Sequence, residues 1–319
     1  MAEFAREHDS YINKYGVPSV TPNGGAGFSI YIAYVRGVAA HYGNDPQTLD
    51  TLLTKVAENA DPQPGEAPEN RDKRRVVAYY FLGLSESNFA NYEKAIEHFQ
   101  HAIDLERTPK DVLSRLVAAE AAAIGNRVVE AQTYLDQVDE ILKDIKGQYV
   151  NAKKQVPSAF RKLGYRAMLI RANIAIARGN DGWSEAIDML RTIKDPHEYY
   201  STATLAQLLI SRDSASAEAR NIFREAYMSI RDLGHLHSVS EVRSKILLLL
   251  VAGLCAQYSE GYTGMMEEHF AEAEGLLGSL PKRGQQTCSV FSPISKRNET
   301  SSVIISHIES VRRGVLLSS

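Results

Sequence analysis

The sequence predicts an all-α fold built from consecutive pairs of helices, and three features lead to this prediction. A stripe of residues spaced four and then three apart, usually small, large and small, recurs along the chain. Turns that contain Gly, Asn or Pro separate the helical segments that carry the stripe. The alternation of apolar and polar residues that is typical of strands is nearly absent.

The clearest copy of the pattern lies in residues 76–109, which read as two helices joined by a tight turn. The stripe of the second helix consists of Ala95, Phe99 and Ala102, which stack along one face. Small residues at Gly83 and Ala95 are expected to let the two helices approach closely, and Phe99 is expected to fill the space between this pair and the next. Asn91 is predicted to cap the second helix, and Pro109 is predicted to end it.

Residues 76–109 resemble the tetratricopeptide repeat (TPR), a helix–turn–helix unit of about 34 residues. The segment departs from the family at Glu86, where a large apolar or aromatic residue is usual. The stripe recurs at Ala131/Leu135/Val138, Ala186/Leu190/Ile193, Ala219/Phe223/Ala226 and Met266/Phe270/Ala273. Some intervals between copies are close to the length of one repeat, whereas the longer ones imply insertions or lengthened helices.

The resemblance covers residues 28–280 and implies a right-handed α-solenoid of about five to six helix pairs with a concave groove. Residues 28–42 and 48–60 are predicted to form a degenerate first pair. Residues 1–27 are predicted to be a short leading helix followed by a Gly/Pro linker. Residues 281–319 are predicted to be a polar loop and a C-terminal capping helix. The apolar positions of that capping helix are Ile304, Ile308, Val311 and Val315.

Two segments inside the predicted solenoid interrupt its helical pattern. Residues 61–71 are rich in proline and are predicted to be a surface connection. Residues 143–166 carry many Lys and Arg side chains against the single acid Asp144, and are predicted to be a basic insertion. This insertion is expected to extend the positive field of any arginines that lie next to it.

Length, charge and cysteine content exclude several classes of protein. The 319 residues are 44% hydrophobic and 24% charged, which is typical of a globular chain rather than a disordered one. A net charge of −3 argues against nucleic-acid binding and against a polybasic membrane contact, because both need a positive excess. The longest apolar run, 246–255, is about half of the ~20 residues that cross a bilayer. With two cysteines and no signal peptide visible, we expect a cytoplasmic protein without a membrane partner.

No catalytic motif or metal-ligand spacing stands out, so we expect a protein that is not an enzyme and has no cofactor. His235 and His237 are close in sequence, but no third ligand accompanies them, and we expect no metal site there. Cys255 lies in an apolar helix and is expected to be inert, whereas Cys288 lies in a polar loop without an evident base. The glycine cluster before residue 28 is interpreted as a hinge rather than a phosphate-binding loop.

The TPR resemblance implies that the first helix of each pair lines the concave groove. The residues that this register places in the groove include Tyr80, Leu84, Asn88, Glu120, Arg171, Arg178, Ser201, Thr204, Ser211 and Arg212. Arg171, Arg178 and Arg212 are predicted to point the same way, and converging guanidinium groups suit a carboxylate or a phosphate. A structural interpretation competes, because Arg178 and Arg212 end helices, where cations are favoured, and Arg171 can pair with a neighbouring acid.

Two functions of different classes follow from this groove. The first is a non-catalytic scaffold that binds a protein or peptide partner, as most helical repeat proteins do, and an acidic segment is one candidate for this partner. The alternative is a sensor whose basic groove binds a small anionic ligand, such as a nucleotide signal or a metabolite, and regulates an effector. The sequence leaves the partner and the oligomeric state open.

Overall fold

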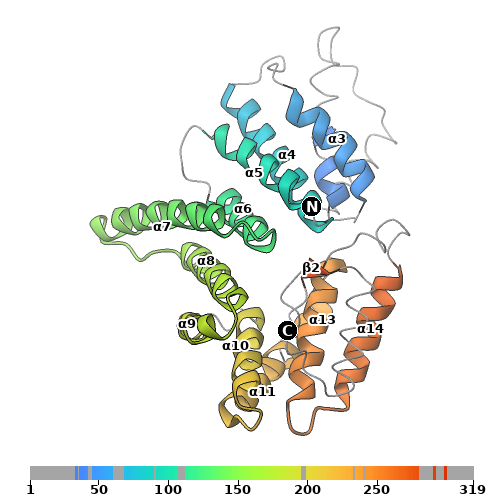
Figure 1. Ribbon diagram of the computed structural model, residues 1–319. Coiled ribbons are helices and arrows are strands. Elements are labelled where there is room, and N and C mark those ends of the chain that lie inside the picture. The colour runs from blue at the N-terminus through green and yellow to red at the C-terminus, as the bar shows by residue number, and fades with distance from the viewer. Residues whose placement is uncertain are drawn as a thin grey trace. The chain divides into compact units, whose positions relative to one another are not determined.

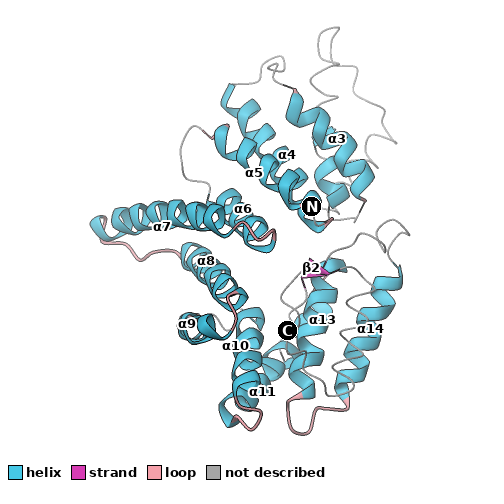
Figure 2. Ribbon diagram, in the orientation of Figure 1, coloured by secondary structure: helices cyan, strands magenta, loops and turns pink. Residues whose placement is uncertain are grey.

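The computed structural model describes residues 33–34, 36–41, 45–59, 68–89, 91–106, 112–194, 199–232, 234–239, 242–279, 290–291 and 298–299. These residues are helical apart from turns, short connections and one pair of two-residue strands, as Figure 2 shows. The prediction of an all-α fold is therefore confirmed. The chain divides into two compact units, Met1–Gly125 and Asn126–Ser319, and each is described by itself.

The first unit is a series of helices in which each packs against the next in the sequence. Its helices are α3 (Pro46–Glu58), α4 (Pro68–Asn88), α5 (Tyr92–Asp104) and α6 (Val112–Ile124), and residues 33–34 and 36–41 are helical as well. The contacts α3–α4, α4–α5 and α5–α6 dominate, and Figure 1 shows α3, α4 and α5 side by side. Leu53, Val56 and Ala78 lie in the apolar core that α3 and α4 share.

The second unit continues the same sequential packing. Its helices are α7 (Val128–Asn151), α8 (Ser158–Ala177), α9 (Asn180–Thr192), α10 (Tyr199–Arg212), α11 (Ala217–Asp232), α12 (His235–Ser238), α13 (Val242–Gln257) and α14 (Met265–Ser279). Successive helices contact one another, and the short α12 lies between α11 and α13, which also pack together directly. One apolar core extends from α8 to α14.

The recurring stripe occupies the core of the helix pairs, as its small, large and small pattern predicts. In the second helix of each pair the members are buried, apart from Ile193, which is half-buried. The fully buried large members are Phe99, Leu135, Phe223 and Phe270, and Leu190 is nearly so. A helix pair with such an apolar face is stable only when a neighbour covers that face, which agrees with the sequential contacts.

Two glycines explain how closely the helices of a pair approach. A Cβ atom at Gly83 of α4 would collide with the ring of Phe99 on α5. A Cβ atom at Gly253 of α13 would collide with the ring of Phe270 on α14 in the same way. The sequence predicted the close approach at Gly83 but not its cause, because Phe99 covers the glycine of its own pair rather than filling the space toward the next pair. The contact of Gly253 was not predicted, because this glycine lies within the long apolar run 246–255.

Helix lengths differ from the sequence prediction in two places. The basic segment 143–166 is not an inserted loop, because α7 continues to Asn151 and α8 begins at Ser158. Lengthened helices therefore account for the long interval between two copies of the stripe. The proline-rich connection predicted for residues 61–71 is shorter than expected, because α4 begins at Pro68. Proline suits the first turn of a helix, where its missing N–H group has no intrahelical acceptor.

The turn before α5 also differs from its prediction. Asn91 is the N-cap residue of α5, as predicted, but its side chain makes no capping hydrogen bond. Its amide Nδ2 instead donates to Oε2 of Glu86 at 2.7 Å. Glu86, the residue at which the segment departs from the TPR pattern, therefore fixes this turn by a polar contact.

The C-terminal part of the chain contains a short antiparallel strand pair where a polar loop was predicted. Val290–Phe291 (β1) pairs with Asn298–Glu299 (β2). The predicted leading helix and linker of residues 1–27 lie outside the described residues, and so does the predicted capping helix with Ile304, Ile308, Val311 and Val315.

Candidate functional site

An open pocket of about 470 Å³ lies within the second unit, and α7, α8 and α9 supply its walls. The middle helix presents Arg171, Ile174, Ala175 and, at its C-cap, Arg178, which share one helical face because they are three, four and seven residues apart. The apolar lining residues are Val128, Val129, Ile174, Ala175 and Met189. The pocket lining therefore combines apolar side chains with charged side chains from three successive helices.

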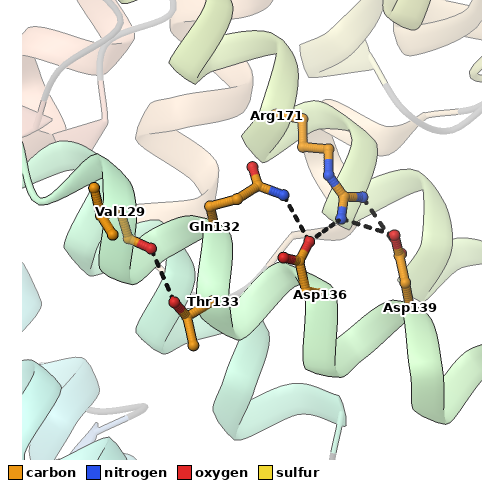
Figure 3. A network of polar contacts seen from close by, with 6 residues as sticks. All are labelled: Val129, Gln132, Thr133, Asp136, Asp139 and Arg171. Carbon is orange, nitrogen blue, oxygen red and sulfur yellow. Dashed lines mark hydrogen bonds and ion pairs between the residues drawn. The ribbon is translucent and has the colours of Figure 1, made fainter.

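The guanidinium group of Arg171 is held by two aspartates of α7, as Figure 3 shows. Its Nη2 donates to Oδ2 of Asp139 at 2.8 Å, and its Nη1 donates to Oδ1 of Asp139 at 3.3 Å. Nη2 also lies 3.8 Å from Oδ1 of Asp136. Because Asp136 and Asp139 are three residues apart, α7 presents both carboxylates to the same arginine.

The second arginine of the pocket has its own acidic partner. Arg178 is the C-cap residue of α8, where the partial negative charge of the helix end favours a cation. Its Nη2 forms an ion pair with Glu185 of α9. Each arginine of the pocket is thus neutralised by a carboxylate from a neighbouring helix. This arrangement agrees with the structural interpretation of Arg171 and Arg178, and the surface is not the basic groove that the sensor hypothesis expects.

Arg171 and Arg178 are the two predicted groove residues that the structure brings together in this pocket. Ser211 and Arg212 are exposed at the end of α10 and are not among the lining residues. Ser201 and Thr204 are buried, with 2% and 0% of their surface exposed. The structure therefore does not place them on an open groove, because residues 199–210 of α10 are buried or half-buried all around the helix.

The remaining predicted groove residues belong to the first unit. Tyr80 and Leu84 of α4 are half-buried, and the ring of Tyr80 packs against Phe81 and Phe99 with centroids 5.5 and 6.1 Å away. Glu120 of α6 is half-buried as well. The side chain of Asn88 lies outside the described residues. Tyr80 therefore contributes to the packing of its own helix pair.

The other polar candidates of the sequence form no site among the described residues. No group of three or more His, Cys, Asp or Glu side chains there is arranged to hold a metal ion. The ring of His235 packs against Tyr199 with centroids 5.5 Å apart. Cys255 is fully buried, and burial raises the pKa of its thiol far above the usual range, so the thiol stays protonated. Cys288 and the glycine cluster before residue 28 lie outside the described part.

Within the described residues, no helix combines the length and the apolar character that crossing a membrane requires.

The sequence did not predict the exposed apolar residues that line the pocket. Val128 and Val129 are exposed apolar side chains at the start of α7, and Val129 keeps 84% of its surface exposed. The hydroxyl of Thr133 donates to the carbonyl of Val129 at 3.0 Å, so it is used within α7. The sequence signal for these residues was the pair of consecutive valines at the start of the helix, after Arg127, because the helical stripe of this segment begins only at Ala131.

Comparison with known proteins gives one limited similarity. No protein-family model matches the chain, and no solved structure matches it. Protein HGV2 of Halocynthia roretzi is 27% identical over an alignment of 121 residues, and the alignment covers 35% of this chain and 22% of HGV2. The chain therefore spans about a fifth of the length of this curated relative. Similarity of this extent does not assign the chain to a family.

Proposed function

We propose that the protein is a non-catalytic interaction scaffold built from TPR-like repeats, and that it binds a segment of a partner protein. The buried stripe in successive helix pairs supports the repeat interpretation, as do the matching contacts of Gly83 with Phe99 and of Gly253 with Phe270. Stacked pairs of this type form a right-handed superhelix whose surfaces are suited to extended partners. The free, buried thiol of Cys255 fits a reducing compartment, and we propose the cytoplasm.

The pocket between α7, α8 and α9 is the proposed binding site. The observation that carries this proposal is the exposure of Val129, which lines the pocket together with the exposed Val128. Large apolar side chains that face water next to a depression are typical of protein-binding surfaces. The charged rim of the pocket supplies hydrogen-bonding groups that would orient the partner segment.

The small-anion sensor is the less supported of the two functions. An anion would have to compete with the carboxylate of Asp139 for Arg171 and with that of Glu185 for Arg178. A bidentate carboxylate on a guanidinium group is already a strong pairing. A scaffold needs no such displacement, because its partner can contact the apolar lining residues of the pocket while both ion pairs stay in place.

The proposal is tested by replacing exposed valines of α7 one at a time. Val129→Asp puts a charge into the pocket, whereas the control Val150→Asp puts the same charge on an exposed valine of α7 that does not line the pocket. Proteins captured by the full-length chain are quantified by mass spectrometry for wild type and both variants. We expect Val129→Asp to lose partners that Val150→Asp retains. Equal capture by all three proteins would contradict the proposed site.

A further inference from the structure

We infer that the partner segment of this pocket is basic as well as apolar, with an aliphatic side chain next to a Lys or Arg. The inference rests on the proposed function and adds the chemistry of the segment that the pocket selects. The aliphatic side chain would lie against Val128, Val129 and Met189, and the cation would reach the carboxylate of Asp136.

The expectation of an aliphatic side chain in the partner segment follows from the apolar residues that line the pocket. Val129 is exposed over 84% of its surface and Val128 over 41%, so a partner can still remove most of this apolar area from water. Ile174 of α8 and Met189 of α9 lie on the other walls. An unbranched thioether such as Met189 adapts to aliphatic side chains of different shape.

The basic half follows from the oxygen atoms of Asp136. Its Oδ1 accepts a hydrogen bond from Nε2 of Gln132 at 2.7 Å and faces Arg171. Its Oδ2 makes no hydrogen bond or ion pair with the described residues. The side chain of Asp136 is 65% exposed, compared with 22% for Arg171. An incoming segment therefore meets an accessible carboxylate oxygen before it meets the guanidinium group.

The balance of charge around the pocket points to the same partner. Asp136 and Glu185 line the pocket together with Arg171 and Arg178, and the exposed Asp139 pairs with Arg171 beside it. Together these ion-paired groups comprise three carboxylates and two guanidinium groups, so their net charge is −1. A cationic segment complements this surface, whereas an acidic segment would first have to separate Arg171 from Asp139. The acidic partner considered from the sequence is thus the less suitable one for this pocket.

The test is a selection from a random peptide display library on the immobilised full-length protein, with counter-selection against the Val129→Asp variant. We expect peptides that depend on the pocket to be enriched in Val, Leu or Ile within a few positions of Lys or Arg. Binding of the most enriched peptide is then measured by fluorescence anisotropy at two salt concentrations. Its affinity is expected to fall as salt increases, because part of the binding is electrostatic.

Matched amide variants separate a specific contact from general attraction. Asp136→Asn keeps the acceptor oxygen toward Gln132 but removes the charge, and we expect it to weaken the selected peptide by about tenfold or more. Asp144→Asn removes an exposed acid of the same helix that does not line the pocket, and we expect a change of about twofold at most. Circular dichroism melting curves establish that both variants remain folded.

The outcomes distinguish this inference from the function on which it rests. Pocket-dependent peptides that are acidic or uncharged, or an Asp136→Asn variant that binds like wild type, would overturn the inference and leave the scaffold intact. If the selection yields no peptide that discriminates against Val129→Asp, the pocket itself is not a peptide site and the proposed function fails with it.

Discussion

The helix pairs α4–α5 and α13–α14 contain the same tripeptide in their second helices, Glu97-His98-Phe99 and Glu268-His269-Phe270. In both pairs the phenylalanine is fully buried, and its ring covers a glycine of the first helix. The two histidines, which precede these phenylalanines, have different surroundings. The comparison therefore separates what the sequence of a pair dictates from what its neighbours add.

The difference between the histidines comes from a third helix. Nε2 of His269 lies 2.9 Å from the hydroxyl of Tyr227, which α11 places beside α14. Nδ1 of His98 is buried without a hydrogen-bond partner in the described part of the chain, and its ring lies 6.1 Å from that of Tyr79. The apolar contact thus repeats with the tripeptide, whereas the polar contact depends on which side chain the adjacent pair supplies.

The variants with the largest expected effect test whether the ring of the phenylalanine contributes equally to the stability of α4–α5 and of α13–α14. Phe99→Ala and Phe270→Ala each remove a fully buried ring, and we expect each to lower the free energy of unfolding by about 3–5 kcal/mol. Urea denaturation of each variant measures this loss. Val150→Ala, at an exposed position of α7, serves as the control and is expected to change stability by less than about 0.5 kcal/mol. A much smaller loss for one phenylalanine than for the other would contradict the equivalence.

A smaller effect tests the difference between the histidines. His269→Leu leaves the hydroxyl of Tyr227 buried without its partner, and we expect a loss of about 1–3 kcal/mol. His98→Leu removes a buried nitrogen that has no partner, so we expect it to be nearly neutral or slightly stabilising. The two variants are compared by urea denaturation at pH 7.5, where both histidines of the wild type are neutral. Equal losses would show that the contact with Tyr227 contributes nothing specific.

The sequence predicted the parts of the fold that depend on local periodicity. The burial of Phe99, Leu135 and Phe223 follows from stripes that any helix of this spacing presents, so their place in the core was predictable without coordinates. The contact between Gly253 and the ring of Phe270 was not predictable in this way, because a glycine inside an apolar run does not indicate which helix packs against it. The repeated Glu-His-Phe tripeptide was a sequence signal that pointed to this second pair.

The candidate site was predictable only in part. The helical register correctly placed Arg171 and Arg178 on one face, since they are seven residues apart on the same helix. It did not predict their partners Asp139 and Glu185, because these acids come from α7 and α9 and depend on how the helices pack. The burial of Thr204 was missed for a related reason: a groove register assumes an open face, and α10 is covered on nearly all sides.

The smallest expected effect is a pH dependence that both pairs share. Burial lowers the pKa of His98 and of His269 below the usual histidine value of 6.5, against the opposing influence of nearby Glu86 and Glu268. As the pH falls below about 6.5, the unfolded chain therefore takes up protons at these sites before the folded chain does. The stability that comes from keeping these two histidines neutral is fully present above this pH. It decreases as the pH falls, until the pH is below the lowered pKa values of the folded state.

The measurement is urea denaturation between pH 7.5 and pH 5, on wild type and on the variant that combines His98→Leu with His269→Leu. Each histidine can contribute a slope of at most ~1.4 kcal/mol per pH unit, because a single proton is involved. We expect the double variant to lose stability less steeply than wild type over this range. Since burial is the leading cause at both positions, each single variant should remove part of the slope, whether or not its histidine has a hydrogen-bond partner. Parallel curves for wild type and the double variant would mean that the two imidazoles are as accessible to protons in the folded chain as in the unfolded one.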